Sequence, residues 1–179
     1  MRINNRISTQ ELQQLVLQLQ KNVPQQYLQN IYHYHDKWLL KWSGGIHLVY
    51  DKNCLWNGSF SERETEIHSV CIKLRKELHN AKCLAVFMPP EDRTLLFEFH
   101  NYFLIMEFFA KGNILLVEKE SLKIVVLTRI YANIRHHYQM DMAIFNSKKE
   151  QKGNETHNNT LSCSIRGDEI FFVENGEYE

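Results

Sequence analysis

The chain has 179 residues, of which 44% are hydrophobic and 12% aromatic, which is enough to build one domain core and excludes a chain disordered throughout. Its 21 basic and 21 acidic side chains give zero formal net charge, but residues 167–179 hold five acids and no lysine or arginine. Residues 1–166 therefore carry a net charge of about +5, which is compatible with nucleic acid as a partner.

The cysteines and the apolar runs indicate the compartment. Cys54, Cys71, Cys83 and Cys163 show no C-x-x-C spacing, so we expect free thiols in a reducing environment. No run approaches the roughly 18 apolar residues of a membrane helix, and the start MRINNRISTQ has no apolar segment of a secretory signal. We expect a cytoplasmic protein with no membrane partner.

The first predicted element is a helix within RISTQELQQLVLQLQKNVP. Ser8 and Glu11 have the spacing of a capping box, and Pro24 follows the end. One apolar face is formed by Leu12, Leu15, Val16 and Leu19. From residue 27 the period changes to two, and breaks at His35-Asp36 and Gly44-Gly45 predict three antiparallel strands, after which CLWNGSF leaves the sheet as a loop.

A second helix is predicted at about 64–80, because its apolar residues share one face. These are Ile67, Val70, Cys71, Leu74 and Leu78. Five β-rich runs follow, AKCLAVFM, RTLLFEFH, YFLIMEFF, NILLVEK and KIVVLTRI, and no helical crossover separates them. We predict an α+β fold, a mostly antiparallel β meander or sandwich with two packed helices.

The predicted organisation is a β-rich domain at 1–145, a polar linker or loop at 146–160, and an acidic tail at 161–179 that includes a short strand or hairpin.

Two groups of residues are candidates for binding. Lys73, Arg75 and Lys76 of the second helix can contact successive phosphates, or they form an ordinary solvated helix face. Asp92 can orient a ribose hydroxyl or an amine while the Arg93 guanidinium forks onto phosphate, or the two residues cap a turn and pair with a neighbour.

Enzyme signatures are missing from the sequence. His33, His35, His136 and His137 lack further ligands at definite spacing, and there is no P-loop, nucleophile elbow or G-x-G-x-x-G motif. We therefore expect a protein that is not an enzyme and that needs no metal and no cofactor.

Six segments, in order, are RISTQEL, NIYHYHDKWLLKW, CIKLRKEL, EDR, LIMEFFAKGNILL and YQMDMA, within residues 6–143. This arrangement resembles the N-terminal domain of NFACT proteins, which include the ribosome-associated quality-control factor, the nuclear export mediator factor and bacterial fibronectin-binding-protein-A-like proteins. The resemblance implies a domain similar to the N-terminal lobe of formamidopyrimidine DNA glycosylases. Because the chain begins Met1-Arg2-Ile3 and not with the catalytic Pro of those enzymes, we expect none of their chemistry.

NFACT proteins of the eukaryotic type hold tRNA on the large ribosomal subunit and support untemplated tailing of stalled chains. The resemblance places the tRNA-recognition residues at Asp92 and Arg93, with the family's other acidic position at Glu11 and with Glu91 in place of the usual glycine. It implies a non-enzymatic RNA-binding module whose partners are tRNA and the large ribosomal subunit. The alternative is a protein-interaction module that kept the fold and lost RNA binding; a salt series separates the two.

Overall fold

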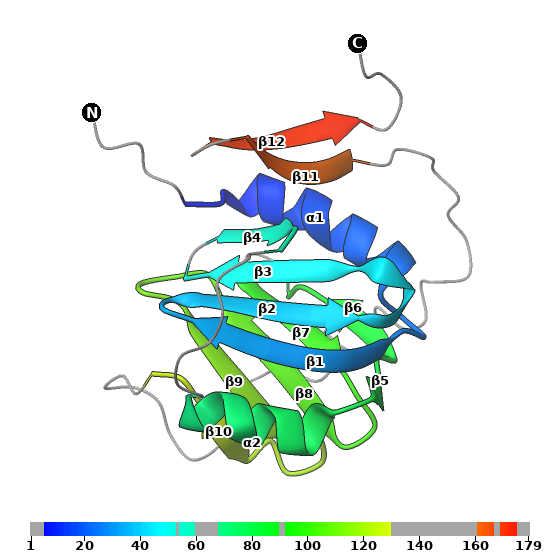
Figure 1. Ribbon diagram of the computed structural model, residues 1–179, viewed down its shortest axis with the longest axis vertical. Coiled ribbons are helices and arrows are strands. Elements are labelled where there is room, and N and C mark those ends of the chain that lie inside the picture. Colours follow the sequence, from blue (N-terminus) through cyan, green and yellow to red (C-terminus); the bar gives the residue numbers. More distant parts are fainter. Residues whose placement is uncertain are drawn as a thin grey trace.

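The computed structural model describes residues 6–52, 54–59, 68–89 and 92–129, and the backbone of residues 161–166 and 169–174. In these residues, two α-helices flank two five-stranded antiparallel sheets (Figure 1). The predicted α+β fold with two packed helices is confirmed, while the likeness to a glycosylase lobe stays a prediction.

The first helix, α1 (Thr9–Asn22), begins at the predicted capping box. The backbone N–H of Glu11 donates to Ser8 Oγ at 3.2 Å, and the backbone N–H of Ser8 donates to Glu11 Oε2 at 2.6 Å. Such a cap stabilises a helix by about 1 kcal/mol. All four predicted apolar residues of this helix are buried in the main core.

The first sheet contains the three strands predicted from the period of two. Its members are β1 (Tyr27–Tyr34), β2 (Lys37–Trp42), β3 (His47–Asp51), β4 (Cys54–Asn57) and β5 (Ala81–Lys82), in the order β4-β3-β2-β1-β5. The prediction that CLWNGSF forms a loop is wrong over its first four residues. A tight reversal with Lys52 at φ 50° pairs Cys54 with Asp51, and Leu55 is fully buried in the core.

The second sheet is a meander in sequence order. It consists of β6 (Ala85–Phe87), β7 (Thr94–Glu98), β8 (Tyr102–Glu107), β9 (Asn113–Glu118) and β10 (Ile124–Leu127). The predicted single run AKCLAVFM divides, because β5 pairs with β1 while β6 pairs with β7. Between β5 and β6, Cys83 exchanges backbone hydrogen bonds with the segment before β1. The backbone N–H of Leu84 donates to the backbone carbonyl of Glu98 in β7.

The main core lies between the two sheets. Trp42 of β2 packs against Phe97 of β7 and against Phe99, just after this strand, with ring centroids 5.4 and 6.0 Å apart. Burying such side chains contributes about 25 cal/mol per Å² of apolar surface, so these contacts hold the sheets together.

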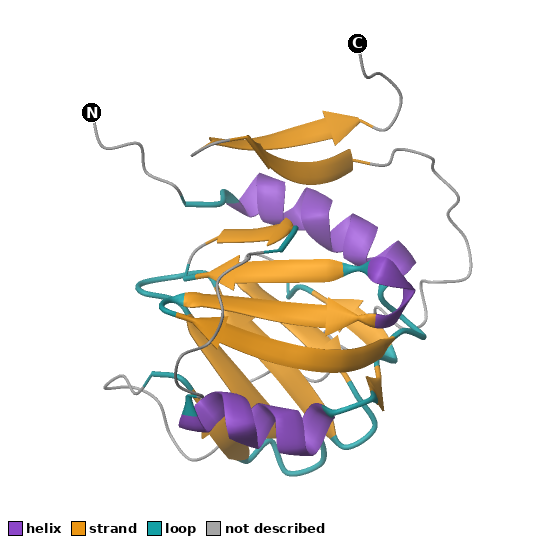
Figure 2. Ribbon diagram, viewed as in Figure 1, coloured by secondary structure: helices purple, strands orange, loops and turns teal. Residues whose placement is uncertain are grey.

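The second helix, α2 (Ser69–Leu78), begins later than the predicted residue 64, because His68 is its N-cap; residues 64–67 lie outside the described part of the chain. It covers the open edge of β1. Cys71 Sγ at 3.3 Å and Arg75 Nε at 2.5 Å both donate to the carbonyl oxygen of Ile31. The edge carbonyl is thus satisfied and shielded from pairing with another strand. Figure 2 shows α1 and α2 at opposite ends of the sheets.

The C-terminal region forms an antiparallel pair, β11 (Leu161–Arg166) with β12 (Glu169–Glu174), and β11 contacts α1 and β4 (Figure 1). The predicted linker at 146–160 lies outside the described residues, and the domain boundaries stay predictions. None of the helices among the described residues is long and apolar enough to cross a membrane.

Candidate nucleic-acid interface

The turn before β7 brings Asp92 and Arg93 to the start of α1. The Asp92 N–H donates to the carbonyl of Pro89 at 3.3 Å, and its Oδ1 accepts a hydrogen bond from Thr94 Oγ1 at 3.1 Å. The Arg93 guanidinium donates to the carbonyl of Ile7, just before the N-cap of α1. Asp92 is exposed and Arg93 half-buried, and no ion pair joins the two in the described structure.

Glu11 belongs to the same end of the molecule as Arg93. The pKa of the Cys54 thiol is raised mainly by burial and lowered by a hydrogen bond with the Ile7 backbone. The charges of Asp51 and Glu11 raise it further, and the charge of Arg93 lowers it. The structure therefore groups the predicted residues Glu11 and Arg93 around Ile7 and Cys54. Glu11 is also held by its capping bond, so its carboxylate is fixed relative to the helix start.

Arg6 is a member of this group that the sequence reasoning missed. Partial burial and the charge of Arg6 both lower the pKa of the Arg93 guanidinium. Two neighbouring cations repel each other, so an anion bound between them relieves an electrostatic cost. The sequence contains one signal for Arg6, its position two residues before the N-cap Ser8. A residue at that position lies beside any group that reaches the start of the helix.

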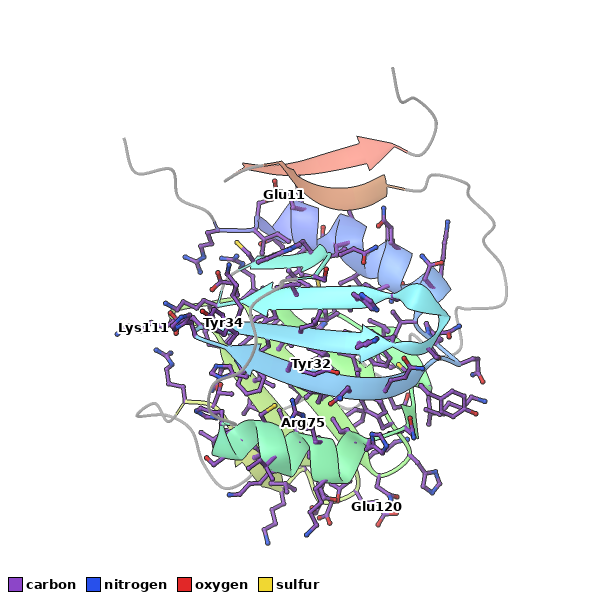
Figure 3. The ribbon with its side chains drawn as sticks, viewed as in Figure 1. Glu11, Tyr32, Tyr34, Arg75, Lys111 and Glu120 are labelled. Carbon is purple, nitrogen blue, oxygen red and sulfur yellow. The ribbon has the colours of Figure 1, made fainter. Side chains whose placement is uncertain are left out.

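Lys73, Arg75 and Lys76 lie on α2, at the other end of the molecule from Glu11 (Figure 3). Lys73 and Lys76 are exposed. Arg75 is half-buried, because it donates to Ile31 and its guanidinium carbon lies 5.2 Å from the centroid of the Tyr32 ring. The two predicted groups therefore do not form one continuous patch, and a single ligand must be long enough to reach both ends.

The histidines near α2 make aromatic contacts. His33 lies 4.3 Å from Trp38 and 4.8 Å from His68 between ring centroids, and His68 Nδ1 accepts from the N–H of Val70. Among the residues that the structure describes, no three His, Cys, Asp or Glu side chains are grouped to hold a metal ion.

In its fold, the chain is similar to a class of solved structures, the N-terminal domains of bacterial fibronectin- and fibrinogen-binding proteins. In the fibronectin-binding protein PavA of Streptococcus pneumoniae, this domain matches with a TM-score of 0.63 and 19% identity, over 78% of this chain and 68% of that one. The N-terminal part of the fibronectin/fibrinogen-binding protein of Streptococcus suis matches with a TM-score of 0.64 and 21% identity, over 72% and 55% of the two chains.

The fibrinogen-binding protein of Staphylococcus aureus has the same fold, with a TM-score of 0.61 and 14% identity over 72% of this chain and 54% of that one. The match thus covers about half the length of the second and third solved chains. No protein-family model and no curated protein sequence matches it. At these identities the comparison shows the fold, and that fold is the one implied by the resemblance to NFACT domains.

Proposed function

We propose that the chain is a non-enzymatic RNA-binding module of the NFACT N-terminal type, that its preferred ligand is tRNA, and that it acts with the large ribosomal subunit. The observation that carries the proposal is the pair of guanidinium groups, Arg6 and Arg93, beside the start of α1. Within the described residues neither forms an ion pair with a carboxylate. A phosphate is an anion whose oxygens match guanidinium groups.

The proposed roles follow from how each side chain is held. Arg93 is oriented by its bond to Ile7 and binds a terminal phosphate of the RNA, with Arg6 as the second cation. Glu11 and Asp92 are acceptors beside this site and orient a ribose hydroxyl or the amine of an aminoacyl group. Contacts with a terminal phosphate, a ribose hydroxyl and an aminoacyl amine select the end of an RNA, because these groups are accessible there without a base-paired partner strand.

Arg93→Ala tests this site. We expect tRNA affinity to fall by about 5- to 150-fold, the effect of losing about 1 to 3 kcal/mol of charge-assisted hydrogen bonding. Fluorescence anisotropy with labelled tRNA measures it, and urea unfolding corrects for the lost bond to Ile7. Lys123→Ala, an exposed lysine beside β10, is the matched control and should bind as the parent does. Equal affinities for Arg93→Ala and the parent would contradict the assignment.

Lys73 and Lys76 are proposed to position the RNA backbone from the opposite end. Lys73→Ala should weaken the binding of all RNAs about equally and lower the slope of log K against log salt by about one unit. A titration of the parent and the variant at several salt concentrations measures this slope. An unchanged slope would assign Lys73 to an ordinary solvated helix face.

The names of the structurally similar proteins favour a second candidate, a protein-interaction module. An apolar protein interface changes little with salt, whereas phosphate contacts weaken steeply as salt rises. Failure of tRNA to bind at low salt, together with salt-insensitive binding of fibronectin or fibrinogen, would support this candidate instead.

A further inference from the structure

The face of the first sheet that points away from the core carries aromatic and basic side chains together. Alternate residues of β1 and β2 enter the core, among them Ile31, Trp38 and Leu40. Their neighbours face outward, namely Tyr32, Tyr34, Lys37 and Lys41, and all four are half-buried. In register, Tyr34 lies opposite Lys37, whereas Tyr32 lies opposite the buried Leu39.

Arg75 adds to this face from α2. Its Nε is bound to the carbonyl of Ile31, and its guanidinium lies over the Tyr32 ring at 5.2 Å. The Tyr32 hydroxyl in turn accepts a hydrogen bond from Asn30 Nδ2 at 3.0 Å. The ring and the guanidinium are thus held in place before any ligand arrives, which lowers the entropic cost of binding. Figure 3 shows Tyr32, Tyr34 and Arg75 on this side of the molecule.

The charges on this face favour a polyanion. Lys37, Lys41 and Arg75 supply three cations, and Asp51, which lies opposite Lys37 in register, is a half-buried carboxylate. Aromatic rings with interleaved cations suit unpaired nucleotides, because every base can stack on a ring or a guanidinium while lysines neutralise the phosphates. A base-paired duplex hides its base faces and cannot use the rings.

We propose that the outward face of the first sheet binds single-stranded RNA, stacking unpaired bases on Tyr34 and on the Tyr32–Arg75 pair while Lys37 and Lys41 contact phosphates. The proposal shares RNA as a ligand with the proposed function but uses a surface distinct from Arg6 and Arg93. It assigns Arg75 to base stacking instead of backbone positioning. Lys73 and Lys76 keep the positioning role.

Labelled oligouridylate is the probe, with binding followed by fluorescence anisotropy in the full chain. Tyr32→Ala should lower its affinity by about 5- to 150-fold, the effect of one lost stacking contact. Tyr32→Phe keeps the ring and should bind within about twofold of the parent, since the aromatic face and not the hydroxyl contacts the base. Lys41→Ala should lower the salt slope by about 0.7, the value for one phosphate contact with a single strand.

Two further arms test whether binding belongs to this face. Lys123→Ala, the exposed lysine beside β10, should leave oligouridylate binding unchanged, and Tyr32→Ala should leave the binding of a blunt RNA duplex unchanged. If Tyr32→Ala binds oligouridylate as the parent does, or if the parent prefers the duplex to the single strand, the stacking proposal is overturned, whatever Arg93→Ala does to tRNA. Loss of oligouridylate binding in Tyr32→Ala but not in Lys123→Ala supports the sheet face even where the tRNA assignment fails.

Discussion

Replacing Gly112 with alanine should destabilise the protein by about 2 to 5 kcal/mol. Gly112 lies in the turn between β8 and β9 at φ +70°, where an L-residue costs about 1 to 2 kcal/mol. Its new Cβ would also collide with the carbonyl of Lys52 and the hydroxyl of Tyr50. That hydroxyl donates to the carbonyl of Glu107 at 2.8 Å and joins the two sheets, so the collision disturbs the joint and adds about 1 to 3 kcal/mol.

Gly45→Ala is the matched control, because Gly45 has nearly the same backbone angle, φ +79°, and nothing within 4 Å of its Cβ position. Gly45→Ala should lower the free energy of unfolding only by the backbone strain, about 1 to 2 kcal/mol. Urea unfolding of both variants measures the difference in the free energy of unfolding. Equal losses in the two variants would show that the contact of the turn with Tyr50 and Lys52 does not hold the sheets together.

Trp42→Ala should cost about 3 to 5 kcal/mol of unfolding free energy. Its ring is 1% exposed and lies between the sheets beside Phe97 and Phe99, so removing it leaves a cavity in the main core. Chemical unfolding followed by far-UV circular dichroism reports the loss without depending on tryptophan fluorescence.

Trp42→Phe separates volume from hydrogen bonding. The indole Nε1 of Trp42 is buried and has no hydrogen-bond partner in the described structure. Phenylalanine removes this unsatisfied donor while keeping an aromatic ring, so the loss should stay below about 1.5 kcal/mol. A loss as large as that of Trp42→Ala would mean that the indole nitrogen is satisfied and stabilises the fold.

The two proposed RNA surfaces fit a ligand that extends over much of the molecule. Arg93 and Arg6 lie at the start of α1. Figure 3 shows Glu11 at that end and Arg75 with α2 at the other end. A folded RNA with an unpaired end and a loop can contact both surfaces. The α1 site is therefore tested with tRNA and the sheet face with oligouridylate.

Local patterns in the sequence predicted most of the elements. The capping box at Ser8 and Glu11, the apolar face of the first helix and the period of two in the strands are properties of neighbours within a few residues. The pattern failed where pairing was decided at long range. AKCLAVFM has one continuous apolar character, and only its two different partner strands divide it between two sheets.

By itself the sequence determined the fold class, the residues of the core faces and the basic character of the second helix. The tertiary structure alone decided which charges meet. Arg93 reaches Ile7 across 86 residues, and Arg75 reaches Ile31 across 44 residues and so comes to lie over Tyr32. Side-chain alternation and helix period are set by backbone geometry that each residue shares with its neighbours, whereas the meeting of distant side chains depends on how the helices close the two sheets.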